Sequence, residues 1–133
     1  MKIAPMRSLV FLAAAAALAL ALVPTTVAKD GDVVVRGTCT KASTAKLKLS
    51  PEDGAIEVEF EVDQNRNGVR WSVSLRRVLA NGTKLIATGT RITRAPSGSF
   101  ELRRVVADRA GRDTIRARAT SSSGEVCRAT ARI

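Results

Sequence analysis

The segment DQNRNG, residues 63–68, is the first part of the sequence that suggests a chemistry. It matches the opening of a calcium loop, D-x-[DN]-x-[DN]-G. An EF-hand loop also needs a bidentate Glu at its twelfth position, where this chain has Ser74. Asp63 is the one carboxylate of the segment. We therefore interpret DQNRNG as a turn in which Asn67 and Gly68 supply positive φ angles, and we predict no metal site.

Catalytic chemistry has few residues to draw on, because the chain contains no His and no Tyr. Glu57, Glu59 and Glu61 alternate along one segment, which places them about 7 Å apart on one face of a strand. Inverting glycosidases use carboxylates at such a spacing, but there the pair flanks a cleft. Here the three carboxylates share one flat face and have no aromatic sugar platform. We interpret them as a solvated charge ladder, and predict no catalytic residue, no enzymatic activity and no cofactor.

Cys39 and Cys127 are the only cysteines and stand near the two ends of residues 29–133. A zinc site needs further Cys or His ligands, which the chain lacks. We expect a disulfide between them, as is usual in exported domains. Closing so long a loop is worth about 4–5 kcal/mol in the chain-entropy model.

The N-terminus has the features of a secretory signal peptide. Lys2 and Arg7 precede an apolar run, residues 9–23, and small residues lead to Ala28. The alternative is a membrane anchor, but the run is shorter than the roughly 20 residues of a spanning helix. We expect cleavage after Ala28, no membrane span after processing, and release of residues 29–133 as an extracellular domain.

Alternating apolar and polar residues predict that this domain is all-β, with one wet face per strand. Turn signals such as Asn67-Gly68 and Asn81-Gly82 separate the alternating runs. The pattern predicts a two-sheet β-sandwich of seven or eight strands. The expected strands are residues 33–39, 45–50, 55–63, 69–79, 84–92, 99–106, 113–121 and 125–132.

The stretch DRAGRDTIRARA, residues 108–119, resembles the E–F corner and F strand of immunoglobulin-like domains, which often have D-x-A-G-x-Y-x-C-x-A. Asp113 takes the place of the Tyr and Ile115 that of the Cys, so neither the tyrosine corner nor the usual inter-sheet disulfide is expected. Trp71 falls on the strand where such domains bury a Trp. The segments KLKLSPEDGAIEVEFEVD and RAPSGSFELRR also resemble small secreted immunoglobulin-like or fibronectin-III-like proteins of high-GC bacteria. This resemblance implies a fold but no activity.

Charge is distributed unevenly over the expected sheets. Residues 29–133 carry 20 basic and 12 acidic side chains, a net charge of +8. With immunoglobulin-like sheet membership, strands 45–50, 55–63 and 99–106 share a sheet in which basic strands flank the acidic one. Strands 69–79, 113–121 and 125–132 share the other sheet, whose outer face carries basic side chains without acids between them. These are Arg70, Arg76, Arg116, Arg118, Arg128 and Arg132.

Arg suits bidentate contact with phosphate or sulfate, so this face is our candidate site for an extracellular polyanion: a cell-wall polymer, DNA or an anionic surface. A purely solubilising surface stays open as the simpler interpretation. We expect a secreted, monomeric, non-enzymatic module without specific nucleic-acid recognition. The alternative function is protein–protein recognition in the envelope or secretome, which would depend less on ionic strength.

Overall fold

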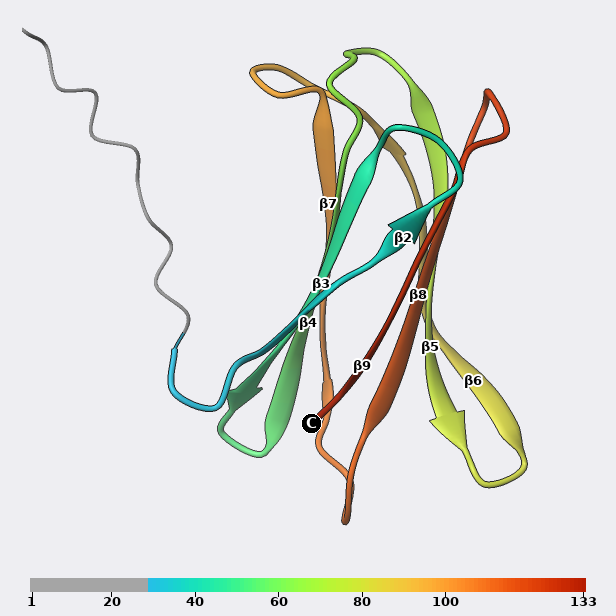
Figure 1. Ribbon diagram of the computed structural model, residues 1–133. Coiled ribbons are helices and arrows are strands. Elements are labelled where there is room, and N and C mark those ends of the chain that lie inside the picture. The colour runs from blue at the N-terminus through green and yellow to red at the C-terminus, as the bar shows by residue number, and fades with distance from the viewer. Residues whose placement is uncertain (1–28) are drawn as a thin grey trace, which may run out of the picture.

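Two antiparallel sheets packed face to face make up the described part of the chain in the computed structural model, which is residues 29–133 (Figure 1). The order in one sheet is β1-β3-β4-β7 and in the other β2-β9-β8-β5-β6. The strands are β1 (Val33–Arg36), β2 (Thr38–Cys39), β3 (Thr44–Glu52), β4 (Ala55–Asp63), β5 (Arg70–Leu79), β6 (Gly82–Ile92), β7 (Ser99–Ala107), β8 (Thr114–Ser121) and β9 (Val126–Arg132).

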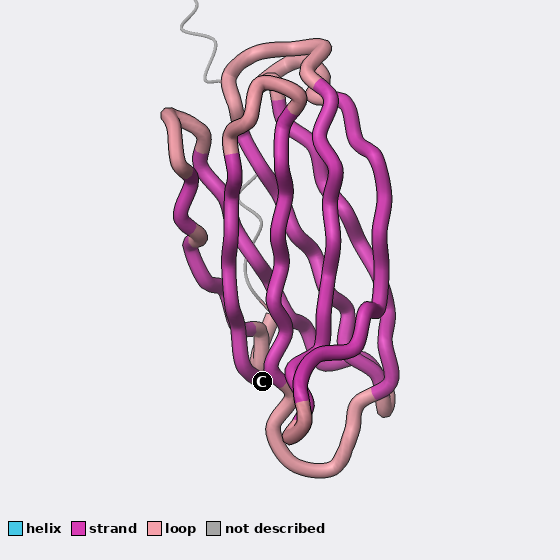
Figure 2. The backbone as a smooth tube through the Cα atoms, turned by 90° about the vertical axis from the view of Figure 1, so that its right-hand side faces the viewer, coloured by secondary structure: helices cyan, strands magenta, loops and turns pink. Residues whose placement is uncertain are grey.

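This architecture confirms the predicted two-sheet sandwich, and the Cys39–Cys127 disulfide is present. The expected sheet membership is also confirmed for β3, β4 and β7 in one sheet and for β5, β8 and β9 in the other. Figure 2, which views the molecule from the side of the five-stranded sheet, shows the strands running lengthwise and the loops gathered at the two ends. A tight hairpin joins β5 to β6 near the predicted Asn81-Gly82 turn. Its two turn residues are Ala80 and Asn81, because Leu79 pairs directly with Gly82, the first residue of β6.

The first strand differs from the prediction, since residues 33–39 are divided between the two sheets. Val33–Arg36 pair with β3 of one sheet, and Thr38–Cys39 pair with β9 of the other. The division falls at Gly37, where an added Cβ would lie 2.5 Å from the carbonyl oxygen of Arg128. A glycine is needed for this close approach of two backbones. The described residues therefore form nine strands where seven or eight were expected.

The core consists of the apolar residues that the alternation placed inside. Leu47, Phe60, Trp71 and Leu75 are fully buried between the sheets. Trp71 packs on Phe100 with ring centroids 5.6 Å apart, and its indole N–H donates to Oε1 of Gln64 at 3.1 Å. Burial of Trp71 therefore leaves no orphaned donor.

The loop at residues 63–68 is closed by the protein's own hydrogen bonds. Asp63 Oδ1 accepts the N–H of Asn65 at 3.0 Å, and Thr93 Oγ1 donates to the carbonyl of Arg66 at 2.6 Å. Positive φ angles occur at Gly68 and at Asn65, with φ of 56°. The prediction that Asn67 would have a positive φ angle was wrong. The Asx turn that Asp63 forms places the left-handed conformation at Asn65, two residues after Asp63.

The predicted signal peptide, residues 1–28, lies outside the described residues. Within residues 29–133, no helix is long and apolar enough to cross a membrane.

Candidate functional site

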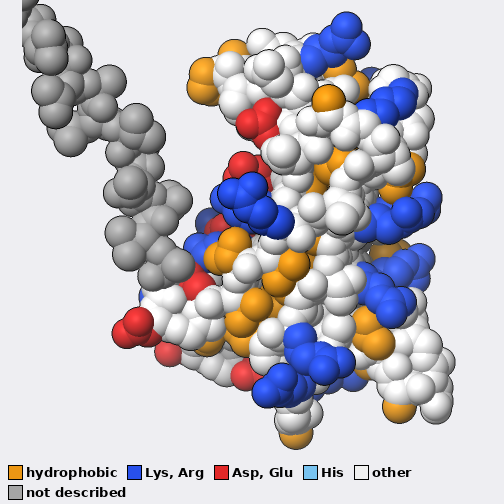
Figure 3. Space-filling view, viewed as in Figure 1, with side chains coloured by type: hydrophobic (Ala, Val, Ile, Leu, Met, Phe, Trp, Pro, Cys, Tyr) orange, Lys and Arg blue, Asp and Glu red, His pale blue; other side chains and the backbone are white. Residues whose placement is uncertain are grey.

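The six predicted arginines all lie on the outer face of the five-stranded sheet. Each of these side chains is exposed, because it alternates with core residues such as Leu75, Ala117 and Ala129. In Figure 3 the flank that carries β5 and β8 shows basic side chains without acidic ones between them, whereas both signs mix over β3 and β4. Among residues 29–133, no ion pair involves any of the six.

The strand register places like charges directly opposite one another on this face. Arg76 of β5 is the direct partner of Arg116 of β8, and Arg118 of β8 is the direct partner of Arg128 of β9. Like charges in such pairs destabilise a sheet. The structure therefore holds four guanidinium groups together at an energetic cost.

These four arginines line one shallow depression of about 430 Å³, which we call the arginine depression. Its other lining residues are Ser74, Ala117, Ala129 and Thr130. Arg70 and Arg132 share the face but not the depression. Arg70 lies at one end of β5, and the Nε of Arg132, at the end of β9, donates to Thr114 Oγ1 at 3.2 Å. The structure thus resolves the six-residue candidate into a central four and two flanking residues.

The outer face of the four-stranded sheet mixes basic and acidic side chains. It includes the like-charged partners Arg36–Lys46 and Glu61–Glu101, but it also contains ion pairs. Lys46 is paired with Glu61 at 3.6 Å and Lys48 with Glu59 at 3.9 Å, and each pair joins direct cross-strand partners. Arg103 forms a further ion pair with Glu57. The neutralisation expected for this face is therefore present, although the ladder is less solvated than predicted, because Glu57 is only 8% exposed.

Two neighbouring carboxyls of this ladder have pKa shifts of opposite sign. The hydrogen bond from Arg103 is the main cause that lowers the pKa of Glu57. Burial is the main cause that raises the pKa of Glu59, and its contact with Glu57 raises it further. The environment of each carboxyl thus decides its protonation more than its residue type does.

A second depression, which sequence reasoning missed, adjoins the arginine depression. It measures about 410 Å³ and we call it the hydroxyl depression. Its lining residues are Ser72, Val73, Ser74, Thr88, Gly89, Thr90, Arg118 and Thr120. The alternation of Ser72 and Ser74 with core residues indicated a shared face. No local pattern indicated that Thr88, Thr90 and Thr120 of two other strands lie beside them.

A buried ion pair between Arg77 and Asp113 also went unrecognised. The two side chains are 4% and 5% exposed and approach to 3.2 Å. Arg77 also donates to the carbonyl of Ala107 at 2.6 Å, and Asp113 accepts the backbone N–H of Arg109 at 3.0 Å. Arg77 stands in the same alternating series of β5 as the core residues Val73 and Leu75, which was the available signal of its inward position. Its partner Asp113 lies far away in the sequence.

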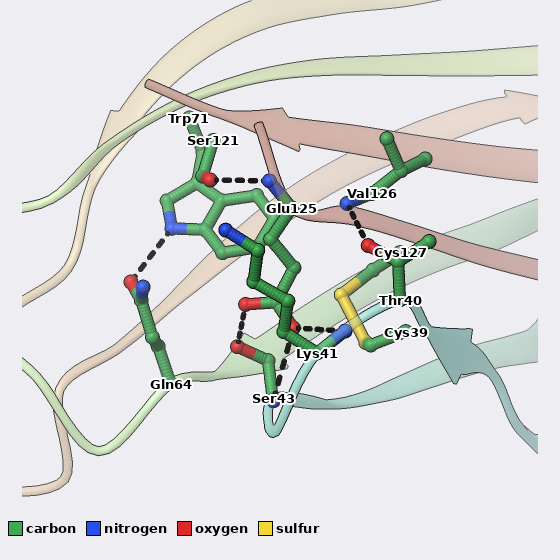
Figure 4. Close-up of a disulfide and its surroundings, with 10 residues drawn as sticks. All are labelled: Cys39, Thr40, Lys41, Ser43, Gln64, Trp71, Ser121, Glu125, Val126 and Cys127. Atoms are coloured by element: carbon green, nitrogen blue, oxygen red, sulfur yellow. Dashed lines mark hydrogen bonds between the residues drawn. A yellow bond between two sulfur atoms is a disulfide. The ribbon is translucent and has the colours of Figure 1, made fainter. Parts of the chain in front are cut away.

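Glu125 lies beside the disulfide and is buried (Figure 4). Its carboxylate accepts the backbone N–H groups of Lys41 and Ser43 at 3.0 and 3.1 Å, and also the hydroxyl of Ser43. Cys39, Cys127 and Glu125 are close enough together to suggest a metal site. Their two sulfur atoms are bonded to each other, so thiolate ligands are not available and Glu125 serves to anchor the 40–43 turn.

Comparison of the chain with protein-family models, with curated proteins and with solved structures finds no match. A function therefore has to be inferred from the charges and contacts of the two sheet faces.

Proposed function

We propose that residues 29–133 form a secreted, non-enzymatic β-sandwich that binds an extracellular polyanion at the arginine depression. The observation that carries this proposal is the contrast between the two faces. On the four-stranded sheet, basic and acidic side chains form cross-strand ion pairs such as Lys46–Glu61. On the five-stranded sheet, the direct partners Arg118 and Arg128 have like charges, and no ion pair within residues 29–133 neutralises either of them.

A solubilising surface does not require this arrangement. The same net charge would serve if the arginines were interspersed with acids or spread over the molecule. Adjacent guanidinium groups instead favour a ligand that supplies closely spaced anionic groups, since each Arg can contact a phosphate or sulfate with two parallel hydrogen bonds.

Base stacking would contribute nothing to such binding. The described aromatic residues are Phe60, Trp71 and Phe100, and all three are buried in the core. Contacts limited to phosphate are blind to sequence and weak, with dissociation constants of about 10⁻⁴–10⁻⁶ M. This supports a polymer with many anionic groups as the ligand, rather than a specific nucleic-acid site.

Three features support an exported, immunoglobulin-like domain as the carrier of this face. The disulfide is typical of an oxidising compartment, in keeping with the predicted signal peptide at residues 1–28. Trp71 is buried on β5, as the resemblance implied. Asp113, in the place of the corner tyrosine, binds the backbone four residues upstream, as a tyrosine corner binds backbone nearby.

The test replaces Arg76, Arg116, Arg118 and Arg128 by Ser and measures retention on immobilised heparin. We expect elution at clearly lower salt. For a phosphate polymer, the log–log slope of affinity against salt should fall by up to about 4, roughly one for each phosphate that an arginine of the wild type neutralises.

The matched control replaces four exposed arginines outside this face, Arg36, Arg94, Arg104 and Arg112, by Ser. Both variants have the same net charge, so equal elution of the two would show that retention reflects charge alone and would refute the site.

The alternative function, protein recognition, has one observation in its favour. Strand β6 lies at the edge of its sheet and exposes Leu85 and Ile92, which are 46% and 42% exposed. Edge strands can accept an added strand from a partner. Capture of a protein partner that persists at high salt, and is abolished in a Leu85→Lys variant but not in the four-arginine variant, would favour this function.

A further inference from the structure

The two depressions form one continuous surface with two kinds of lining. Ser74 and Arg118 line both. The strand register sets Arg128, Arg118, Ser74 and Thr88 in a single row across β9, β8, β5 and β6. Because neighbouring strands are about 4.8 Å apart, the row changes from the guanidinium groups of Arg128 and Arg118 to the hydroxyls of Ser74 and Thr88 within roughly 10 Å.

The hydroxyl side continues in the next row, where Thr120, Ser72 and Thr90 are direct partners across the same strands. Within residues 29–133, no hydrogen bond to another protein group occupies any of the five hydroxyls of the hydroxyl depression. Each is therefore free to donate one hydrogen bond and to accept two. Arg118 is the one charged residue of its lining.

This lining discriminates between kinds of polyanion. Phosphate and sulfate groups only accept hydrogen bonds, so a chain made of such groups alone would leave the Ser and Thr lone pairs without donors. Groups that lose water without gaining partners oppose binding. A ligand hydroxyl both donates and accepts, and so satisfies the hydroxyl depression without placing a second anion where cations are few.

We infer that the ligand is a polymer in which anionic phosphodiesters alternate with hydroxyl-bearing polyol units. The phosphodiester lies at the arginine depression and the polyol hydroxyl at the hydroxyl depression. This inference rests on the proposed function and narrows the polyanion to a chemical class.

Two synthetic oligomers of equal length test it, one of glycerol phosphate and one of 1,3-propanediol phosphate. They have the same charge and spacing and differ in one hydroxyl for each unit. We expect the protein to bind the glycerol phosphate oligomer roughly threefold to tenfold more tightly, the effect of about one hydrogen bond, as measured by calorimetry at low salt.

A variant with Ser72→Ala, Thr90→Val and Thr120→Val should bind both oligomers equally, at the affinity that the wild type has for propanediol phosphate. The matched control changes three exposed hydroxyl residues that do not line the hydroxyl depression, Thr44→Val, Thr83→Val and Ser122→Ala, and should keep the preference.

The outcomes separate the two proposals. Equal wild-type affinity for the two oligomers, or a preference that survives in the Ser72/Thr90/Thr120 variant, overturns the polyol inference, while the four-arginine variant still tests the polyanion function. If the wild type binds neither oligomer, the polyol inference fails and retention on heparin still tests the polyanion function. If the four-arginine variant binds both oligomers as the wild type does, both proposals fail. Tighter binding of oligothymidylate than of glycerol phosphate would point to a nucleic acid and overturn the inference.

Discussion

At the scale of single residues, Glu57 and Glu59 show how position within one strand decides the behaviour of a side chain. Both point outward from β4, yet Glu57 is bound by Arg103 while Glu59 has only distant cations, Lys48 at 3.9 Å and Arg103 at 3.8 Å. Glu101 of β7 adds a further negative charge near Glu59. The pKa of Glu57 is lowered and that of Glu59 is raised.

Substitution by Gln should therefore have opposite pH dependences at the two positions. The lowered pKa of Glu57 means that its carboxylate stabilises the fold above the unfolded value of 4.5, and that this stabilisation is lost as the pH falls through the folded value. The raised pKa of Glu59 means that its contribution is present at low pH and is lost as the pH rises through the folded value.

Glu57→Gln should destabilise the protein at neutral pH, with a difference from wild type that shrinks in acid. Glu59→Gln should gain stability relative to wild type as the pH rises from acid to neutral. Urea unfolding at several pH values measures both. Parallel curves for the two variants would contradict the opposite shifts.

At the scale of elements, the loops depend on polar side chains that fix their ends. Asp113 stands before β8 and binds Arg77 of β5 in the sheet interior. Removing one member of a buried ion pair leaves an uncompensated charge, which costs about 3–5 kcal/mol. Asp113→Asn keeps one oxygen, which can accept from Arg109, but it removes the charge and places an NH2 donor where Arg77 had an acceptor.

We expect Asp113→Asn to lower the free energy of unfolding by about 3–5 kcal/mol, measured by chemical denaturation. Asp108→Asn changes an exposed acid of the same loop and should have an effect within about 0.5 kcal/mol. A similarly small effect of Asp113→Asn would show that water solvates the charge of Arg77 once its partner is lost, and would contradict the prediction.

The 63–68 loop leads to a prediction about calcium. Its Asp63 carboxylate is engaged by Asn65, and the loop is further held by Thr93, whose carbonyl accepts the N–H of Gly68 at 2.8 Å. Millimolar calcium or a chelator should therefore leave the melting temperature unchanged. Calcium at 100 times its dissociation constant would add about 2.7 kcal/mol, a shift of several degrees, and such a shift would refute the structural role of the loop.

At the scale of the whole molecule, the disulfide and the arginine depression belong to the same five-stranded sheet, in which β2 and β9, from near the two ends of residues 29–133, lie side by side. Cys39 and Cys127 are 88 residues apart and are direct partners of β2 and β9. The same sheet carries the arginine depression on its outer face. The disulfide therefore links the edge strand β2 to β9 in the sheet whose outer face carries the candidate site.

Reduction of the disulfide should lower the free energy of unfolding by about 4–5 kcal/mol, because it returns loop entropy to the unfolded chain. A Cys39→Ser, Cys127→Ser variant should unfold at the same denaturant concentration as the reduced wild type. Equal stability of the oxidised and reduced proteins would mean that the native contacts of β2 and β9 alone hold the ends together.

The sequence by itself determined which side chains point outward together. Its alternation indicated the strands, the buried Trp71 and the outward direction of the six arginines, because side chains of a strand alternate with a period of two. The placing of these arginines on one sheet came from the resemblance to immunoglobulin-like domains. The disulfide followed from there being only two cysteines in a chain with a predicted export signal.

Only the tertiary structure decided which residues of different strands are direct partners or neighbours. Alternation specifies a face but not a register, and register between strands far apart in the sequence is set by packing and by crossovers between sheets. That is why the pairing of Arg118 with Arg128, the joining of Arg77 to Asp113 and the gathering of hydroxyls from three strands could not be predicted. The division of the first strand at Gly37 has the same cause, since it depends on the carbonyl of Arg128, a residue near the other end of the chain.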